Sequence, residues 1–487
     1  KKSHAPVLAI IGQVPREERG SDFFQEVNND VLFADVSVFN QTVTDADQFP
    51  ELLEQAVNTA LAQSGVAVLS IPGDVGALEL PKGTRTPRFV DPPPPGAATA
   101  EAVRAIASVL NAADSATLLV GHGARHAHDE VLALADKLAA PMVLTLKAKD
   151  GFDDATDYEV GQSGLLGNPA SAAAFAGGDV LVMIGTDFPY RNFYPEGKTV
   201  VQIDIRGAHI GRRTPVDHAL VGDSQLTLQA LLPLLEGEKS RKHLDHSVKE
   251  YATWRTLQAR LTDPAYEHKA TGFLRSKVDN RSGRIRPELV AAAVDRHAPA
   301  DASFTSDTGM STVWLARFVR MTGGRRLIGS YNLGSMANAM PQALGLQALD
   351  RKHTVVGFCG DGGLSMLLGD LITAVSHDLP VKLIVFDNGR LGMVKLEMEQ
   401  VGLPEFGTVL HNPDFAAVAT AIGLKGIRVE DPADVDAAIA EAFATEGPVL
   451  VDAVTNPDEI AIPPKPSLEQ MKGFAIAKTR EIADSAE

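Results

Sequence analysis

The chain has 487 residues, of which 45% are hydrophobic and 22% are charged, and its formal net charge is −17. This composition is typical of a large globular protein, and the acidic balance argues against a nucleic-acid-binding protein, which needs a basic surface. No stretch approaches the ~20 apolar residues of a membrane-spanning helix, and the single cysteine, Cys359, rules out an internal disulfide.

The first block of the chain, residues 1–90, alternates strands and helices. Val7–Ile11 and Val66–Ile71 are apolar runs of strand length, and Phe49–Ser64 has the length and composition of a helix. Asp91–Gly96 follows, and its four consecutive prolines predict a stiff polyproline linker.

Two further blocks repeat the alternation of helices and strands. The second, residues 97–235, leads into a charged and mostly helical linker over residues 236–285, and the third covers residues 286–465. Residues 466–487 form a predicted amphipathic C-terminal helix. The elements predicted in the second block are helices Ala100–Ala112 and Asp129–Ala139, strands Ala116–Val120, Met142–Leu146, Val180–Ile184 and Val200–Ile205, and a final segment Leu226–Leu235. The pattern predicts an α/β protein of three doubly wound, mostly parallel-sheet domains.

An acid and an amide follow two neighbouring predicted strands of the third block. Asp361, within Gly-Asp-Gly-Gly, comes after the apolar run Thr354–Cys359, and Asn388 comes after Val381–Phe386. In a parallel sheet both strand ends lie at the ligand-binding edge, and the two side-chain oxygens suit a Mg²⁺ ion that also holds a diphosphate. The alternative is that Asp361 only caps a helix, which leaves the position of Asn388 unexplained.

The pattern from Gly-Asp-Gly to the distant asparagine resembles the fingerprint of thiamine diphosphate-dependent enzymes. The segments 304–309 and 332–342 resemble the opening of the diphosphate domain and the loop that grips the aminopyrimidine. Residues 185–190 and 209–213 resemble the FAD-contacting turns of the pyruvate oxidase branch, including its quinone-linked members. The resemblance implies a pyrimidine-type domain whose N-terminal part is missing, a central FAD-type domain and a diphosphate-type domain.

The resemblance also implies the residues that hold the coenzyme. Asp361, Asn388 and the backbone carbonyl of Arg390 are the expected Mg²⁺ ligands. Met336 is the expected apolar support that folds the two coenzyme rings together, and the Gly334 carbonyl is expected to accept a hydrogen bond from the 4′-amino group. The other expected contacts to the coenzyme are Ser335, Gly362, Gly363, Gly389, Leu391, Gly392 and Val394.

The second block contains the candidate flavin contacts. Gly121 and Gly123 form a glycine turn after a strand but do not complete a dinucleotide fingerprint. Asp204 ends a strand and could accept a hydrogen bond from a ribose hydroxyl or cap the following turn. The resemblance implies that FAD contacts Thr186, Asp187, Phe188, Pro189, His209, Ile210, Gly211, Arg212, Arg213 and Thr227. The alternative for Arg212 and Arg213 is a solvated surface pair.

Catalytic roles follow from the same resemblance. Glu397 stands where pyruvate oxidases have an active-site glutamate, and Met393 stands where an aromatic residue has been assigned to electron transfer. Because methionine is not aromatic, this sequence departs from the family pattern at Met393, and the electron-transfer role of the aromatic residue does not carry over. Gln25 is expected to reach the substrate of a partner subunit, which implies a homodimer or homotetramer. The activating glutamate of the family is expected upstream of Lys1, so the chain resembles a fragment.

Three functions are compatible with these residues. The favoured one is oxidative decarboxylation of pyruvate to acetate and CO2, using thiamine diphosphate, Mg²⁺ and FAD, with electrons passed to a quinone. A carboligase such as acetolactate synthase would keep FAD as a structural group, but its usual tryptophan is absent from Lys395–Met398. A catalytically inactive fragment is the third. The favoured function implies a cytoplasmic protein with possible peripheral contact at the inner face of the cell membrane, and no nucleic-acid partner.

Overall fold

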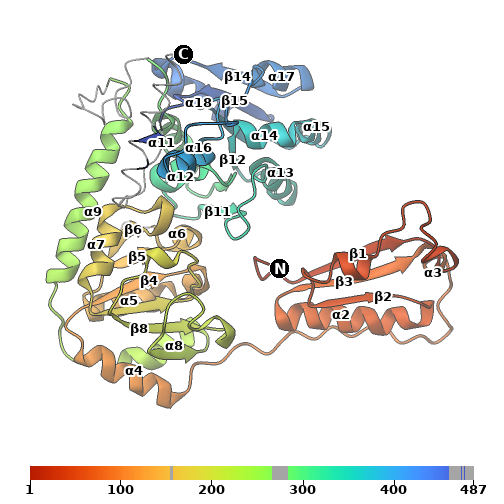
Figure 1. The fold of residues 1–487 in the computed structure, drawn as a ribbon, viewed down its shortest axis with the longest axis horizontal. Coiled ribbons are helices and arrows are strands. Elements are labelled where there is room, and N and C mark those ends of the chain that lie inside the picture. The colour runs from red at the N-terminus through yellow and green to blue at the C-terminus, as the bar shows by residue number, and fades with distance from the viewer. Residues whose placement is uncertain (154–156, 266–282, 460–472, 474–475, 478–487) are drawn as a thin grey trace. The chain divides into compact units, whose positions relative to one another are not determined.

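The computed structural model describes residues 1–487 except 154–156, 266–282, 460–472, 474–475 and 478–487. It divides into two compact units, Lys1–Pro95 and Gly96–Glu487. The described chain confirms an α/β protein with three parallel sheets, each accompanied by helices (Figure 1). None of its described helices combines the length and the apolarity that a membrane crossing requires.

The first unit holds a three-stranded parallel sheet in the order β1-β3-β2. Its strands are β1 (Val7–Gln13), β2 (Phe39–Thr42) and β3 (Val66–Pro72), and its helices are α1 (Asn29–Leu32), α2 (Phe49–Gln63) and α3 (Gly73–Gly76). The predicted helix over Phe49–Ser64 is therefore confirmed to within one residue. Its apolar face packs on β3, where Ala67 and Leu69 are fully buried.

The second unit opens with a six-stranded parallel sheet in the order β6-β5-β4-β7-β8-β9. Its strands are β4 (Ala116–Val120), β5 (Met142–Leu144), β6 (Glu159–Gln162), β7 (Val180–Ile184), β8 (Thr199–Asp204) and β9 (His218–Val221). The helices are α4 (Ala100–Ala112), α5 (His128–Leu138), α6 (Lys149–Phe152), α7 (Pro169–Gly177), α8 (Ser224–Leu231) and α9 (Lys242–Leu261). Counted from its first strand, this is the 3-2-1-4-5-6 order of dinucleotide-binding folds, which bind ligands where the order reverses, here between β4 and β7.

The sequence-based boundaries in this block hold with small corrections. Helix Ala100–Ala112 and strands Ala116–Val120 and Val180–Ile184 are observed with the predicted bounds. The strand predicted to run to Leu146 ends at Leu144, because a 3-10 turn begins at Leu146. Of the predicted linker helix, α9 is described, whereas residues 266–282 and nearly all of the predicted C-terminal helix lie outside the described residues.

The last sheet is parallel and has the order β11-β10-β12-β13-β15-β14. Its strands are β10 (Ser303–Ser306), β11 (Arg326–Gly329), β12 (Val355–Gly360), β13 (Lys382–Asp387), β14 (Lys425–Val429) and β15 (Val449–Val454). The helices are α11 (Pro287–His297), α12 (Met310–Phe318), α13 (Ala339–Leu349), α14 (Asp361–Met366), α15 (Leu371–Ser376), α16 (Gly392–Gln400), α17 (Phe415–Ile422) and α18 (Val435–Ala444). The order reverses between β10 and β12, so a ligand site is expected at their carboxyl ends.

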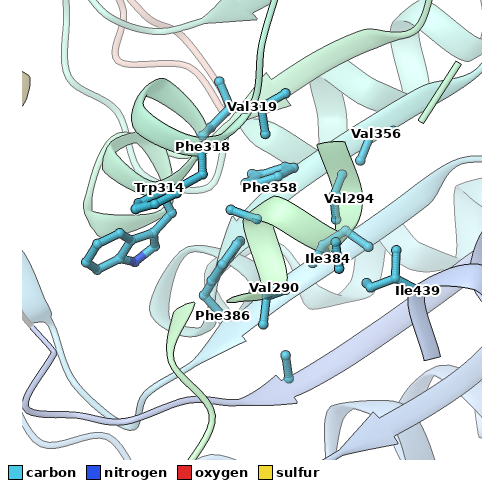
Figure 2. Close-up of a cluster of buried hydrophobic side chains, with 14 of the residues drawn as sticks. Val290, Val294, Trp314, Phe318, Val319, Val356, Phe358, Ile384, Phe386 and Ile439 are labelled. Carbon is cyan, nitrogen blue, oxygen red and sulfur yellow. The ribbon is translucent and has the colours of Figure 1, made fainter. Parts of the chain in front are cut away.

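Buried side chains on both faces of this sheet hold its strands in place. On one face, Phe304, Phe358 and Phe386 pack with ring centroids 6.2 and 5.2 Å apart, under helices α11, α12 and α18 (Figure 2). Cys359 belongs to the cluster on the other face and is fully buried, as a core residue should be. Because successive residues of a strand point to opposite faces, both clusters are needed to cover the sheet.

A buried acid joins the two sheets of the second unit. The Asp150 carboxylate lies 3.3 Å from the guanidinium groups of both Arg125 and Arg326, which come from the two different domains. It also accepts a hydrogen bond of 3.1 Å from the backbone N–H of Leu327. The backbone N–H of Met321 donates similarly to Asp153, at 2.8 Å. These contacts connect the central domain to the C-terminal domain.

Candidate active site

The carboxyl ends of β10, β12 and β13 surround a pocket in which the space free of protein atoms, with the open solvent at its mouth included, is about 630 Å³. Its wall brings together most of the residues predicted to bind the coenzyme. These are Met336, Asp361, Gly362, Gly363, Asn388, Arg390, Leu391, Gly392 and Val394, and Met393, predicted as a catalytic residue, lies in the same wall. Gly334, Ser335, Gly389 and Glu397 lie beside this wall rather than in it, and Gln25 lies in the first unit, with a φ of 66°.

Asp361 is held by three N–H donors at the end of β12. Its carboxylate accepts hydrogen bonds of 2.8 Å from the backbone of Gly362, the backbone of Gly389 and the side chain of Asn412. Burial raises the pKa of the Asp361 carboxyl to about 6, although these donors favour the charged form. A divalent cation would stabilise the charge that burial disfavours.

The donor set at the strand ends fits Mg²⁺. The Asn388 side-chain oxygen accepts a hydrogen bond of 2.9 Å from the N–H of Arg390, so that the turn after β13 is tightly closed. Among the described residues, no three His, Cys, Asp or Glu side chains form a metal cluster. A cation here would therefore depend on one carboxylate, one amide oxygen and a backbone carbonyl, with diphosphate and water supplying the rest, which is how Mg²⁺ is usually held.

Two glycines leave the room that a diphosphate needs. A Cβ atom at Gly362 would lie 3.0 Å from Leu391 and 3.3 Å from Met336. At Gly363 it would lie 2.2 Å from a carboxylate oxygen of Asp307, so any side chain there would displace this acid. Backbone N–H groups can therefore approach a ligand at this turn.

Asp307 is a structural acid. In the sequence it was considered only as part of the segment 304–309. It follows β10, and its carboxylate accepts hydrogen bonds from the N–H groups of Ala339 at 2.9 Å and Gly360 at 3.0 Å. It thereby joins the ends of β10 and β12 to the start of α13. Its position at a strand end inside Ser-Asp-Thr-Gly was the signal available in the sequence.

The loop before α13 presents Met336 to the pocket. Gly334 has a φ of 76° and its N–H donates to the Ser330 carbonyl at 2.6 Å, so the loop turns sharply there. The Ser335 hydroxyl donates to the carbonyl of Met336, and the Ser335 carbonyl accepts from the N–H of Thr308 at 3.1 Å. The loop is thus fixed to the wall that Met336 lines.

Helix α16 begins at the pocket and extends toward the central domain. Met393 and Val394, in its first turn, line the pocket, and Met393 also packs against the aromatic cluster of the sheet. Glu397, one turn later, is exposed. Burial and, secondarily, the charge of Glu397 raise the pKa of the Tyr190 phenol.

Glycines close the switch point of the central sheet. The N–H of Gly123 donates to the Gly185 carbonyl at 2.9 Å, which joins the turns after β4 and β7. A Cβ atom at Gly121 would lie 2.4 Å from the Gly185 carbonyl oxygen, and one at Gly185 would lie 2.5 Å from the backbone of Gly123. This glycine turn, which does not complete a dinucleotide fingerprint, is therefore part of the expected nucleotide-binding edge.

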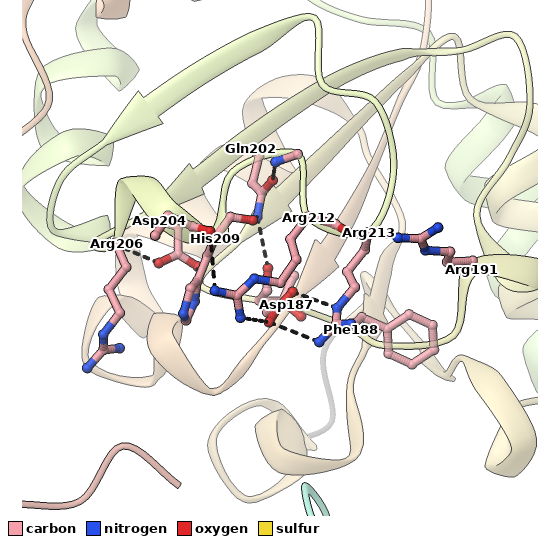
Figure 3. Close-up of polar contacts among 12 residues, drawn as sticks. Asp187, Phe188, Arg191, Gln202, Asp204, Arg206, His209, Arg212 and Arg213 are labelled. Atoms are coloured by element: carbon pink, nitrogen blue, oxygen red, sulfur yellow. Dashed lines mark hydrogen bonds and ion pairs between the residues drawn. The ribbon is translucent and has the colours of Figure 1, made fainter. Parts of the chain in front are cut away.

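The predicted flavin turns lie side by side at this edge (Figure 3). The side chain of Gln202 donates to the carbonyls of Thr186 and His209 at 3.3 and 3.4 Å, and it accepts from Gly211 at 3.0 Å. The sequence reasoning did not single out Gln202, because a buried polar residue inside a strand carries no motif. Asp204 accepts from the N–H of Arg206 at 2.8 Å, and burial raises the pKa of its carboxyl.

Both predicted phosphate-binding arginines are paired with one acid. Asp187 lies 3.1 Å from Arg212 and 2.9 Å from Arg213 (Figure 3). The two cations are thus gathered at the turn, where Arg212 is exposed and Arg213 is partly buried, and an anionic cofactor group could pair with them at this edge. Thr227 is placed differently: it is fully buried, and its hydroxyl accepts a hydrogen bond from Ala98 at 3.0 Å.

Several residues in or beside the pocket carried no sequence signal. Trp314, from a helix, and Glu459, from the chain after β15, line the pocket, and Asn412, from a loop, bonds to Asp361 in its wall. Burial raises the pKa of Glu459 to about 7, and burial together with the charge of Glu459 raises the pKa of Glu288 well above the ordinary range. Their distance along the chain from the fingerprint explains why no motif included them.

Family models match both domains of the second unit. The model for the C-terminal, TPP-binding domain of thiamine pyrophosphate enzymes matches residues 307–453, and the model for their central domain matches residues 103–231. The Bacillus subtilis protein YdaP, whose name associates it with thiamine pyrophosphate, is 34% identical over 482 residues, which cover 98% of this chain and 80% of that protein. The chain belongs to the thiamine pyrophosphate enzyme family.

Relatives of two activities are about equally similar to this member of the family. A pyruvate oxidase of Lactiplantibacillus plantarum is 29% identical over 94% of this chain and 75% of its own length. An acetolactate synthase of Mycobacterium bovis is 30% identical over 93% of this chain and 74% of its own length. The coenzyme thus follows from the family, whereas the reaction needs an argument from the site.

Proposed function

We propose that the protein catalyses the thiamine diphosphate- and FAD-dependent oxidative decarboxylation of pyruvate and passes the electrons to a quinone. One observation carries the proposal. Helix α16 lines the coenzyme pocket with Met393, and the charge of Glu397, one turn later, contributes to the raised pKa of Tyr190, which ends the first predicted flavin segment. Helix α16 therefore extends from the coenzyme pocket to a carboxylate that acts electrostatically on the first predicted flavin segment.

The proposed overall reaction is balanced. Pyruvate and water yield acetate, CO2, two protons and two electrons, and the electrons reduce a quinone to a quinol. When bound, thiamine diphosphate supplies a carbanion that adds to the 2-oxo carbon and accepts the charge left by CO2, and FAD supplies a two-electron acceptor. The protein contributes binding, orientation and exclusion of water.

The residues of this chain have distinct parts in that scheme. Asp361, Asn388 and the Arg390 carbonyl would hold Mg²⁺, and the glycines after Asp361 would admit the diphosphate. Met336 projects into the same pocket, where it would support the folded coenzyme. Leu391, Met393 and Val394 form an apolar wall that limits the access of water to the reacting carbon.

The carboligase is the second candidate, because acetolactate synthases are as similar to the chain as the pyruvate oxidase is. The segment Lys395–Met398 lacks the tryptophan that the carboligases usually carry there. We therefore favour the oxidoreductase. Gln25 is assigned to the substrate of a partner subunit in a homodimer or homotetramer, and the proposed location is the cytoplasm, with peripheral contact at the membrane that holds the quinone.

An anaerobic experiment separates the two reactions. Protein loaded with thiamine diphosphate, Mg²⁺ and FAD is mixed with pyruvate while the visible band of oxidised flavin is followed. We expect rapid bleaching, acetate as product and recovery of the band on addition of a soluble quinone analogue. Formation of acetolactate without bleaching would establish the carboligase instead. If neither acetate nor acetolactate forms, the substrate is a different 2-oxo acid or the chain is inactive.

A further inference from the structure

Lys395 is a buried lysine beside the coenzyme pocket. It lies on α16 directly after the pocket residues Met393 and Val394, and its side chain is only 4% exposed. Its ammonium group lies 3.0 Å from a carboxylate oxygen of Asp458 and 3.5 Å from one of Glu405. A lysine is almost never buried to this extent unless it is paired, so the position demands these partners.

Glu405 connects Lys395 to Arg390 in the expected metal-binding turn. Its other carboxylate oxygen lies 2.9 Å from the guanidinium of Arg390 and accepts a hydrogen bond from the hydroxyl of Thr408. Arg390 is the residue whose carbonyl is the expected third Mg²⁺ ligand. Lys395, Glu405 and Arg390 therefore form a continuous chain of charges from α16 to the turn.

The loop that carries Glu405 also covers the turn. The N–H of Leu391 donates to the Thr408 carbonyl at 2.8 Å, and the N–H of Leu410 donates to the Gly389 carbonyl at 2.9 Å. We call residues 404–412 the strap, because they cross the end of β13. The strap is fixed at one end by Asn412, which bonds to Asp361, and near the other end by Glu405.

We propose that Lys395 is a positioning residue for the metal and the coenzyme, which acts by holding the strap and the Asp458 segment against α16. Through Glu405 it would orient the Arg390 carbonyl, and through Asp458 it would hold Asn456 and Glu459 in the pocket wall. Residues that orient metal ligands in this way contribute strongly to metal affinity although they do not touch the metal. The inference rests on the coenzyme part of the proposed function and not on the reaction.

Coenzyme binding tests the proposal without turnover. The chain has two tryptophans, and Trp314 lines the pocket whereas Trp254 stacks on Tyr251 of α9. In a Trp254→Phe background, the fluorescence of Trp314 reports thiamine diphosphate binding as Mg²⁺ is titrated. We expect Lys395→Met to raise the Mg²⁺ concentration for half-saturation on the order of 10- to 100-fold, and Lys395→Arg, which keeps the charge, to recover much of the loss.

Two further variants separate positioning from a general loss of structure. Glu405→Gln should weaken binding in the same way, and its combination with Lys395→Met should be little weaker than either single variant, since both break one chain of contacts. Lys425→Met removes an exposed lysine that pairs with Glu441 and serves as the matched control. If Lys395→Met fails to fold by circular dichroism, Glu405→Gln and Lys395→Arg carry the test.

The outcomes are decisive in either direction. Near-normal Mg²⁺ dependence in Lys395→Met or in Glu405→Gln, a Lys395→Arg variant as weak as Lys395→Met, or additive effects in the double variant would overturn the positioning role. Failure of the parent protein to bind thiamine diphosphate would instead refute the coenzyme part of the proposed function. The two failures are therefore distinguishable.

Discussion

The side-chain amide of Asn412 donates a hydrogen bond of 2.8 Å to the carboxylate of Asp361, and a second, of 2.6 Å, to Asp387. It therefore holds the expected metal ligand in place and stabilises the carboxylate at the end of β13. We expect Asn412→Ala to weaken Mg²⁺-dependent coenzyme binding by about 10- to 100-fold, measured by Mg²⁺ titration at fixed thiamine diphosphate. Unchanged affinity would show that Asn412 only fixes the strap and does not support the metal site.

Removal of the ligand itself should be more severe. We expect Asp361→Ala to abolish Mg²⁺-dependent binding of thiamine diphosphate, because Asp361 supplies the one carboxylate among the three expected ligands. Isothermal titration measures this directly. Asp301→Ala, at an exposed position of the same domain, is the control. Retained binding in Asp361→Ala would refute the metal assignment.

Met336 is expected to affect reactivity more than binding. In Met336→Ala the metal and diphosphate contacts remain, so coenzyme affinity should change little. Because the rings would lose their support, we expect proton exchange at the thiazolium C2 to slow by about 100-fold, measured by NMR after quenching in deuterated buffer. The exposed Met366 provides the control variant Met366→Ala. Equal exchange rates in both variants would contradict the supporting role.

The arginine pair gives a prediction for flavin retention. Loss of two charge-assisted hydrogen bonds to a pyrophosphate should lower FAD affinity at least ~10-fold in the double variant Arg212→Ala, Arg213→Ala. The flavin-to-protein absorbance ratio after gel filtration measures this. Arg241→Ala, which removes an exposed arginine paired with Asp245, should retain flavin. A normal ratio in the double variant would mean that Arg212 and Arg213 only form ion pairs with Asp187 and do not bind FAD.

A pH dependence of stability follows from Glu159. Burial, and secondarily the charge of Asp153, raises the pKa of this carboxyl from 4.5 to about 7. Between these values the folded protein binds a proton that the unfolded chain releases, so the stabilisation is complete below pH 4.5 and is lost as the pH rises through 7. The contribution is up to about 3 kcal/mol. Thermal unfolding from pH 5 to 8 should show a steeper decline for the parent protein than for Glu159→Gln.

Strand positions were predictable because fully buried parallel strands are nearly uniform apolar runs. Val180–Ile184 and Ala116–Val120 are such runs, and the structure shows them with the predicted bounds. The ends of the strands were predicted less accurately. Leu146 was assigned to a strand on its hydrophobicity, but it belongs to the turn that begins the next helical segment.

The site was predictable where it depends on a strand end and not where it depends on tertiary packing. Asp361 and Asn388 follow neighbouring strands, so their meeting follows from the parallel topology. Asn412 reaches the same point from a loop 51 residues further along the chain. For Thr227 the resemblance gave a position but not the hydrogen bond that its hydroxyl accepts from the N–H of Ala98.

The closure of the pocket by distant segments has a consequence for folding. Asp307 bonds to Gly360, 53 residues away, so the site is complete only after several non-local strand pairs have formed, and such pairings form slowly. A coenzyme that recognises only this finished arrangement stabilises the folded chain by mass action, by about 2.7 kcal/mol at 100 times its dissociation constant. In a cell short of thiamine, more of the chain would pass through unfolded states that proteases degrade, and its abundance would follow the supply of the vitamin.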